Sequence, residues 1–239
     1  MGGPVTLCAA AYAAWHTSSL TALGLRSERA NGIWRALDRP PYIYLAGITL
    51  EAGVTSDAVA DVPGSVGDVW QELDLEPHGF RVWRTEPWFY RAPGVAPGPV
   101  PSELEIVHVK TPAEVAEFEA VSVRGFGNED DAIELGTFHP PAILDDHAMH
   151  MFVGRVEGRA VAAAMGYVLD DVVGVFGVTT VASARRRGYG DALTRAALLP
   201  DTGLPAVLAP SEEAESMYLR LGFEPVGALT IWSKAGPGP

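Results

Sequence analysis

Hydrophobic and polar positions alternate clearly through the C-terminal part of the chain. LEIVHVK at 104–110 has the two-residue period of a half-buried strand, and residues 151–181 contain three further strand segments. From Tyr189 onward the period becomes helical, with apolar residues at Tyr189, Ala192, Leu193, Ala196 and Ala197. The pattern then predicts a strand at 205–209, a helix at 212–221 and a strand at 225–234.

Two helices are predicted between the first strand and the next. Thr111 should cap one of them, with Glu114 three residues later completing a capping box. A second helical region is predicted near 130–146. The predicted order of this part is therefore β-α-α-β-β-β-α-β-α-β.

The N-terminal part has a less regular pattern. It predicts helices at 4–23 and 65–73 and strands at 32–37, 42–50 and 81–91. Residues 93–101 hold four prolines and two glycines, a composition typical of a semi-rigid linker. We therefore expect a mixed α/β domain at 1–92, a linker at 93–102 and a second domain at 103–239. No motif match shows whether the first is a degenerate repeat of the second.

Composition and charge narrow the class of protein. The chain has 239 residues, 48% of them hydrophobic, and a net charge of -13, which argues against a nucleic-acid partner. Cys8 is the single cysteine, so an internal disulfide is excluded and a reducing cytoplasm fits. The N-terminal apolar run is broken by His16-Thr17-Ser18, which argues against a signal peptide or membrane partner. Only two of 17 basic residues are lysine, which suggests a GC-rich bacterial genome.

Residues 185–190, RRRGYG, break two local rules. Three arginines stand at a helix N-terminus, where the helix dipole disfavours cations. Two glycines stand in the first turn of the same helix, where each lowers helix stability relative to alanine. Both features make sense if the helix start binds an anion, because unpaired N–H groups point outward and glycine lets phosphate approach the backbone. A solvated arginine run is the competing interpretation.

These residues resemble the GNAT N-acetyltransferase superfamily. Arg185, Gly188 and Gly190 fill its Arg/Gln-x-x-Gly-x-Gly/Ala signature, although Ala182 stands where proline is common. A second hallmark, a helix ending in Tyr-x-x-x-Gly-Phe, is met by Tyr218, Gly222 and Phe223. The resemblance covers roughly 103–236. It implies the GNAT acyl-CoA N-acyltransferase fold, an α/β (α+β) fold with a mixed, mostly antiparallel sheet and splayed central strands, here joined to an N-terminal mixed α/β part.

The resemblance also implies acetyl-CoA as cosubstrate. The helix start would hold its pyrophosphate, and backbone groups at the end of the fourth strand would bind the pantetheine arm. The cofactor-binding residues expected on this basis are Val178, Thr179, Thr180, Arg185, Arg186, Arg187, Gly188, Tyr189 and Gly190. One backbone N–H of that strand would stabilise the oxyanion.

Tyr218 is the expected catalytic residue. In the family this tyrosine protonates the departing thiolate, a role suited to general acid catalysis. Tyr218 also lies on the apolar stripe of its helix, so a core tyrosine is the alternative. Ser211 is expected to cap that helix and Gly222 to end it.

The sequence leaves the general base and the acceptor open. The strand VVGVFGVTTV carries no acid, so the base is water or a carboxylate of the 128–134 loop, which holds Glu129, Asp130, Asp131 and Glu134. These carboxylates would also attract a cationic amine. No metal is expected, because the histidines of DDHAMH at 145–150 are weak evidence for a site.

Two functions fit these features. The first is transfer of an acetyl group from acetyl-CoA to a primary amine of a small molecule or peptide by direct attack. The alternative is a non-catalytic acyl-CoA-binding sensor or regulatory module. A homodimer is left open.

Overall fold

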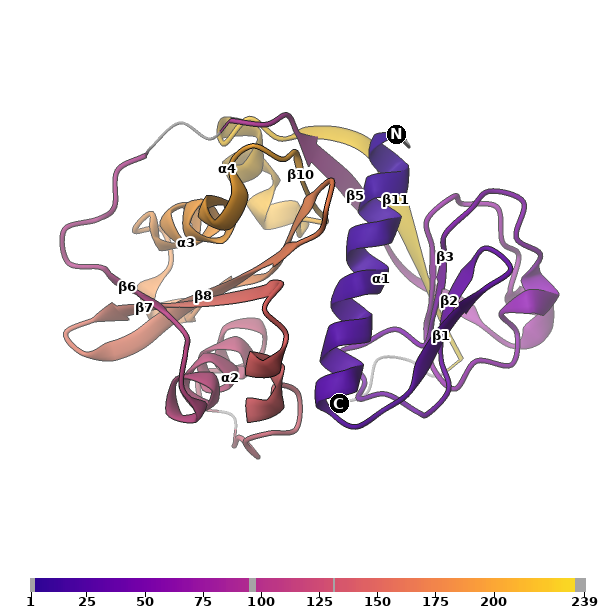
Figure 1. The fold of residues 1–239 in the computed structure, drawn as a ribbon, viewed down its shortest axis with the longest axis horizontal. Helices are drawn as coiled ribbons and strands as arrows, with labels where there is room; N and C mark the ends of the chain where they lie inside the picture. The colour runs from indigo at the N-terminus through magenta and orange to yellow at the C-terminus, as the bar shows by residue number, and fades with distance from the viewer. Residues whose placement is uncertain (1–2, 95–97, 131, 235–239) are drawn as a thin grey trace.

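The fold is built on a single mixed sheet. The computed structural model describes residues 3–94, 98–130 and 132–234. Eleven strands lie in the order β1-β2-β3-β4-β11-β5-β10-β9-β8-β7-β6, and within the described chain only the β3–β4 and β9–β10 pairs are parallel (Figure 1). The strands are β1 (Ser27–Ala30), β2 (Ile33–Ala36), β3 (Gly47–Thr49), β4 (Val66–Asp68), β5 (Arg81–Arg91), β6 (Glu105–His108), β7 (Met149–Val156), β8 (Arg159–Val168), β9 (Val173–Thr180), β10 (Ala206–Leu208) and β11 (Glu224–Ser233). The expected α/β (α+β) class with a mostly antiparallel sheet is confirmed.

Four α-helices pack on this sheet in the described residues: α1 (Pro4–Ala22), α2 (Pro112–Phe126), α3 (Tyr189–Leu198) and α4 (Glu215–Arg220). The predicted capping box of α2 is present, because Thr111 accepts from the Glu114 backbone and Glu114 accepts from the Thr111 backbone. Such a box satisfies N–H groups that a helix start leaves unpaired. The alternation seen in the sequence at 151–181 forms β7, β8 and β9.

The sheet continues across the linker. Strand β5, from the first part of the chain, lies between β10 and β11 of the second part. Strand β11 in turn pairs with β4 of the first part. The strand order and directions are therefore nearly symmetric about the central β11–β5 pair. This symmetry supports the proposal that the first part is a degenerate repeat of the second, with the last strands exchanged.

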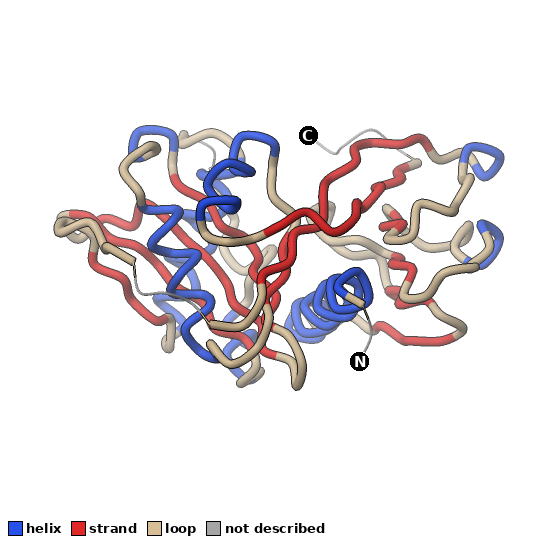
Figure 2. Tube along the Cα trace, turned by 90° about the horizontal axis from the view of Figure 1, so that it is seen from above, coloured by secondary structure: helices blue, strands red, loops and turns tan. Residues whose placement is uncertain are grey.

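Helix α1 stands between the two groups of strands (Figures 1 and 2). It contacts β9 and β10 on one side and β3 on the other. Trp15 stacks on Phe176 of β9 with ring centroids 4.7 Å apart, while His16 accepts a 3.0 Å hydrogen bond from the Leu45 backbone. The stacked aromatic pair thus joins the first part to the sheet of the second, and the buried hydrogen bond holds α1 against the rest of the first part.

Three predicted elements differ from the structure. Only 47–49 of the predicted strand 42–50 is a strand, and 65–73 forms β4 and a turn instead of a helix. The turn is fixed by Asp68, whose carboxylate accepts from the backbones of Trp70 and Leu73. Pairing with β3 and β11 overrides the local helical pattern.

The second helix expected near 130–146 is also absent from its described residues. That stretch contains the 3-10 helix η3 (Pro141–Asp145) after an irregular loop. The buried Glu119 carboxylate holds this loop by accepting from the backbones of Gly136, Phe138 and His139. Backbone N–H groups that already donate to a side chain are satisfied without helical hydrogen bonds, so the side chain competes with helix formation.

Candidate active site

The site begins where β9 and β10 separate. The two strands pair only at Val173 and Gly174, while β9 continues to Thr180. On its other edge β9 carries a bulge, because its register with β8 shifts between Phe176 and Thr179. Gly177 lies in this bulge with φ +59°, a conformation that favours glycine. The splayed strands expected from the family resemblance are therefore present.

Helix α3 starts at the open end of this splay. Gly188 precedes it with φ +81°, and a Cβ added there would come no nearer than 3.7 Å to its closest neighbour, Pro101. No side chain caps the helix, so the N–H groups of its first turn are left for another acceptor. This is the geometry of an anion site.

The three arginines of residues 185–187 differ in their contacts and in their position relative to the groove. Arg185 donates to the carbonyl oxygens of Thr180 (3.1 Å) and Gly125 (2.9 Å), which ties the end of β9 to the end of α2. Arg186 has a left-handed backbone, φ +63°, and its side chain lines the groove. Arg187 does not line it and lies near Glu103, which also accepts a 2.9 Å hydrogen bond from the Tyr189 hydroxyl. Of the three, Arg186 is best placed to meet an anion.

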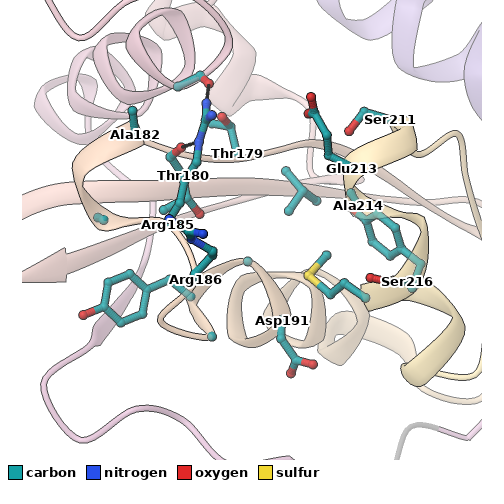
Figure 3. Close-up of a pocket in the computed structure, with 18 of the residues that line it drawn as sticks. Thr179, Thr180, Ala182, Arg185, Arg186, Asp191, Ser211, Glu213, Ala214 and Ser216 are labelled. Carbon is teal, nitrogen blue, oxygen red and sulfur yellow. Dashed lines mark hydrogen bonds between the residues drawn. The ribbon is translucent and has the colours of Figure 1, made fainter.

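These elements enclose a groove of about 990 Å³ (Figure 3). Eight of the nine predicted cofactor-binding residues line it; they are Val178, Thr179, Thr180, Arg185, Arg186, Gly188, Tyr189 and Gly190. Residues far apart in the sequence thus surround one cavity, to which β9, the start of α3 and α4 each contribute. Their contacts with a coenzyme stay a prediction.

Tyr218 lies on α4 and lines the groove from that helix. Its helix ends in a Schellman motif: Phe223 N–H bonds to the Tyr218 carbonyl and Gly222 N–H to that of Leu219, with Gly222 at φ +83°. The predicted helix end at Gly222 is therefore confirmed. Ser211 occupies the N-cap position of the preceding turn, but its side chain makes no capping bond.

Tyr218 is buried yet lines the groove. Burial raises the pKa of Tyr218 to about 12, and a hydrogen bond with the Thr194 side chain opposes this shift. Thr194 donates its own O–H to the Gly190 carbonyl at 2.8 Å. The phenol is therefore protonated at neutral pH. This arrangement fits a proton donor, and it also fits a structural tyrosine.

The acidic loop lies outside the groove. Glu129 accepts from the Ser183 backbone at its rim, and neither Glu129, Asp130 nor Glu134 lines the cavity. Asp131 lies outside the described residues. Among the described residues two carboxylates do line the groove, Asp191 and Glu213.

The sequence interpretation missed several groove residues. Phe126, Glu213, Met217 and Arg220 line the cavity without belonging to either recognised motif. Nearness to Tyr218 in the sequence is the signal that could have found Glu213, Met217 and Arg220. Phe126 ends α2, far in the sequence from both motifs, and gave no such signal.

Metal-ligand clusters and membrane-spanning helices are both absent from the described residues. Within residues 3–94, 98–130 and 132–234, no group of three His, Cys, Asp or Glu side chains is arranged to hold a metal ion. Asp146, in the DDHAMH segment, instead accepts from the Tyr167 hydroxyl at 3.0 Å. None of the described helices has the length and apolar character needed to span a bilayer.

Comparison with protein families agrees with the geometry. Residues 116–223 match the model of the acetyltransferase (GNAT) family, a span that contains α2, the splayed strands, α3 and α4. The chain therefore contains a GNAT-family acetyltransferase domain and has the family's fold. No curated protein matched the sequence.

Solved structures show that the fold extends over nearly the whole chain. A GCN5-related N-acetyltransferase from Kribbella flavida has a TM-score of 0.65 at 22% identity, covering 95% of this chain and 96% of that one. A GNAT-family protein described as a putative acetyltransferase, from Novosphingobium aromaticivorans, has a TM-score of 0.56 at 22% identity, covering 93% and 96%. A GCN5-related N-acetyltransferase-like protein from Streptococcus suis has a TM-score of 0.58 at 17% identity, covering 96% and 98%. The arrangement of both parts thus recurs in other proteins.

Proposed function

We propose that this protein transfers an acetyl group from acetyl-CoA to a primary amine of a small-molecule or peptide acceptor. The observation that carries the proposal is the continuity of one groove from the uncapped start of α3, past the bulge of β9, to the hydroxyl-bearing wall of α4. An uncapped helix start, a free strand edge and a buried tyrosine meet there. Family membership supports acyl transfer, and the acetyl group and the amine acceptor are our inference.

The residues would divide the work along the groove. First-turn N–H groups of α3 would bind the pyrophosphate, with Arg186 beside it. The strand edge that β10 leaves free on β9 would bind the pantetheine amides, and one N–H near Val178 would donate to the thioester oxygen. This oxygen gains negative charge when the amine attacks the carbonyl carbon.

Tyr218 would act when the intermediate collapses. As the carbon–sulfur bond breaks, its O–H would give a proton to the departing thiolate. The protonated form is available throughout the neutral range, because burial raises the pKa of Tyr218 to about 12. Cys8 is buried and lies on α1, so a covalent acyl-cysteine step is not part of this proposal.

The competing function is a non-catalytic acyl-CoA-binding module. The absence of an acid on β9 favours it, since the proton acceptor used by some relatives is missing. Release of free thiol from acetyl-CoA, measured with a panel of amines, separates the two. Thiol release that depends on an amine supports the enzyme; tight coenzyme A binding with no release from any amine supports the module.

The partner predictions follow the same proposal. We propose a cytoplasmic location, supported by the single buried Cys8, and no nucleic-acid or membrane partner, supported by the net charge of -13. The oligomeric state stays a prediction, and light scattering in solution would distinguish a homodimer from a monomer.

A further inference from the structure

The Glu213 carboxylate is an acidic group in the groove that the preceding mechanism does not use. It lies on the 3-10 helix η6 (Glu212–Ala214), at the turn that leads into α4. It makes no hydrogen bond or ion pair with another described residue. Asp191, the other carboxylate of the described lining, is paired with Arg195 at 2.8 Å. Glu213 is thus the unpaired acid of the described groove.

Its position within the groove differs from that of the anion site. Figure 3 shows the Glu213 side chain extending from η6 toward β9, on the same side of the groove as Thr179. Arg186 and Asp191 lie at the other side, beside the start of α3 (Figure 3). A negative charge would oppose phosphate binding at the helix start, and Glu213 is kept away from it. At the free edge of β9 the same charge would meet an incoming amine.

The chemistry of amide formation requires a proton acceptor. A primary amine is an ammonium ion at neutral pH and has no lone pair for attack. The acceptor loses two protons in becoming an acetamide, and the departing thiolate takes up one through Tyr218. One proton must therefore leave the site.

We propose that Glu213 binds the ammonium group of the acceptor and accepts the proton that leaves it, directly or through one water. The nitrogen–carbon bond then forms as the thioester carbonyl opens, and the carbon–sulfur bond breaks as Tyr218 protonates the sulfur. The second amine proton restores the phenol, and Glu213 releases its proton to solvent. The acceptor class is consequently a cationic amine. This inference rests on the proposed acetyl transfer.

The loop carboxylates are less suited to this role. Glu129 is engaged with the Ser183 backbone, and the described acids of the 128–134 loop do not line the groove. Glu213 also stands five residues before Tyr218 on the same connected turn and helix. The proton acceptor and the proton donor would thus be held in one wall of the groove.

The test compares Glu213→Gln with Glu212→Gln. The two positions are adjacent, both side chains are exposed and each variant removes one negative charge, but Glu212 does not line the groove. Coenzyme A affinity is measured by calorimetry, and kcat/KM for the amine that gives the fastest thiol release is measured from pH 6 to 10. We expect kcat/KM of Glu213→Gln to fall by about 10²–10⁴-fold at neutral pH, the usual range for general acid–base catalysis.

Further readouts separate a chemical role from a structural one. The deficit of Glu213→Gln should shrink toward high pH, where the free amine is abundant, and Glu213→Asp should restore part of the rate. Coenzyme A affinity should be the same in all variants. Equal activity in the Glu213→Gln and Glu212→Gln variants, or a deficit that is constant with pH, would overturn the proposal. If the wild type binds coenzyme A but acetylates no amine, both the proposed function and the role of Glu213 fail; if it turns over and Glu213→Gln matches it, only Glu213 fails.

Discussion

The two ends of the sheet share a strand pattern and differ in the connection between their parallel strands. In the first part, residues 50–65 join β3 to β4 and contain, as their described helical turn, η1 (Ser56–Ala58). In the second part, residues 181–205 join β9 to β10 and contain α3 with its glycine start. An anion site needs the free N–H groups of a helix start, so the second connection can provide one and the first cannot.

The parallel strands themselves also behave differently. At the end of β3, Thr49 accepts a 2.9 Å hydrogen bond from the Val69 backbone, which links β3 to the chain just beyond β4. At the equivalent end of β9, Leu208 of β10 pairs with β5 alone. The ends of β3 and β4 are thus linked to each other, whereas the ends of β9 and β10 are separated. A similar sheet therefore produces a groove only where the strands separate.

A third difference concerns the turn before the exchanged strands. Gly79-Phe80 precedes β5 as Gly222-Phe223 precedes β11, and both glycines have φ near +80°. In both turns the phenylalanine N–H bonds five residues back, to Leu75 in the first and Tyr218 in the second. The first part thus keeps the turn and carries a leucine where the second carries the hydroxyl. The comparison indicates that the site depends on a few substituted positions and one connection.

The largest expected effect comes from making the second turn chemically like the first. Tyr218→Phe keeps the ring and removes the hydroxyl, so kcat should fall by roughly 10²–10⁴-fold with little change in coenzyme A affinity. Melting temperature is measured on the same variant. A structural tyrosine would instead lose about 1 kcal/mol of stability and keep its turnover. A folded Tyr218→Phe enzyme with wild-type kcat would falsify the general-acid assignment.

A matched pair of glycines tests the two connections. Gly188→Asp and Gly53→Asp place the same side chain at φ +81° and φ +79°, where a Cβ has no close neighbour. Two charges 4 Å apart interact by about 4 kcal/mol at an effective dielectric constant of 20, so coenzyme A affinity should fall by about 10²–10³-fold in Gly188→Asp. Calorimetry should find no change in Gly53→Asp. Equal affinities in both variants would place the anion site elsewhere.

A buried histidine in each part should make stability depend on pH. Burial lowers the pKa of His16 and of His139 to about 4, below the value of about 6.5 in the unfolded chain. The unfolded state therefore binds more protons, and stability, full above pH 6.5, falls as pH drops toward 4. Between pH 7.5 and 5 the loss should be about 2 kcal/mol per histidine.

Denaturant titrations at both pH values check this dependence. His16→Gln and His139→Gln should each remove about half of the decline attributed to the pair, and the double variant should remove both contributions. Charging His16 would also break the hydrogen bond that its Nε2 accepts from Leu45. If the decline is unchanged in the double variant, these histidines are not its cause.

The smallest expected effect concerns the arginines. Arg186 lines the groove and Arg187 does not, so Arg186→Gln should weaken coenzyme A binding by up to about 5-fold, in keeping with an exposed ion pair. The difference should shrink as salt rises. Arg187→Gln serves as the control. Dephospho-coenzyme A should bind more weakly than coenzyme A if Arg186 reaches the 3′-phosphate, and equal affinity would remove that contact alone.

Much of the second part could be predicted from the sequence. Strand alternation at 151–181, the capping box at Thr111 and the glycine end of α4 are local patterns, and local sterics and hydrogen bonding determine them. The two motifs around Gly188 and Tyr218 indicated the family, because each fixes a backbone geometry at a helix end. The matching Gly79-Phe80 was present as a sign of repetition and was missed.

Only the tertiary structure decided which side chains share the groove. The exchange of β5 and β11 depends on pairing between residues more than 100 positions apart, which no local pattern specifies. Pairing with β3 and β11 turned 65–73 into a strand and a turn, and the buried Glu119 held the loop before η3 out of a helix. Arg185 links β9 to α2 by a hydrogen bond, Arg187 does not line the groove, and Glu213 does line it. Packing between elements distant in the sequence sets the direction of each side chain.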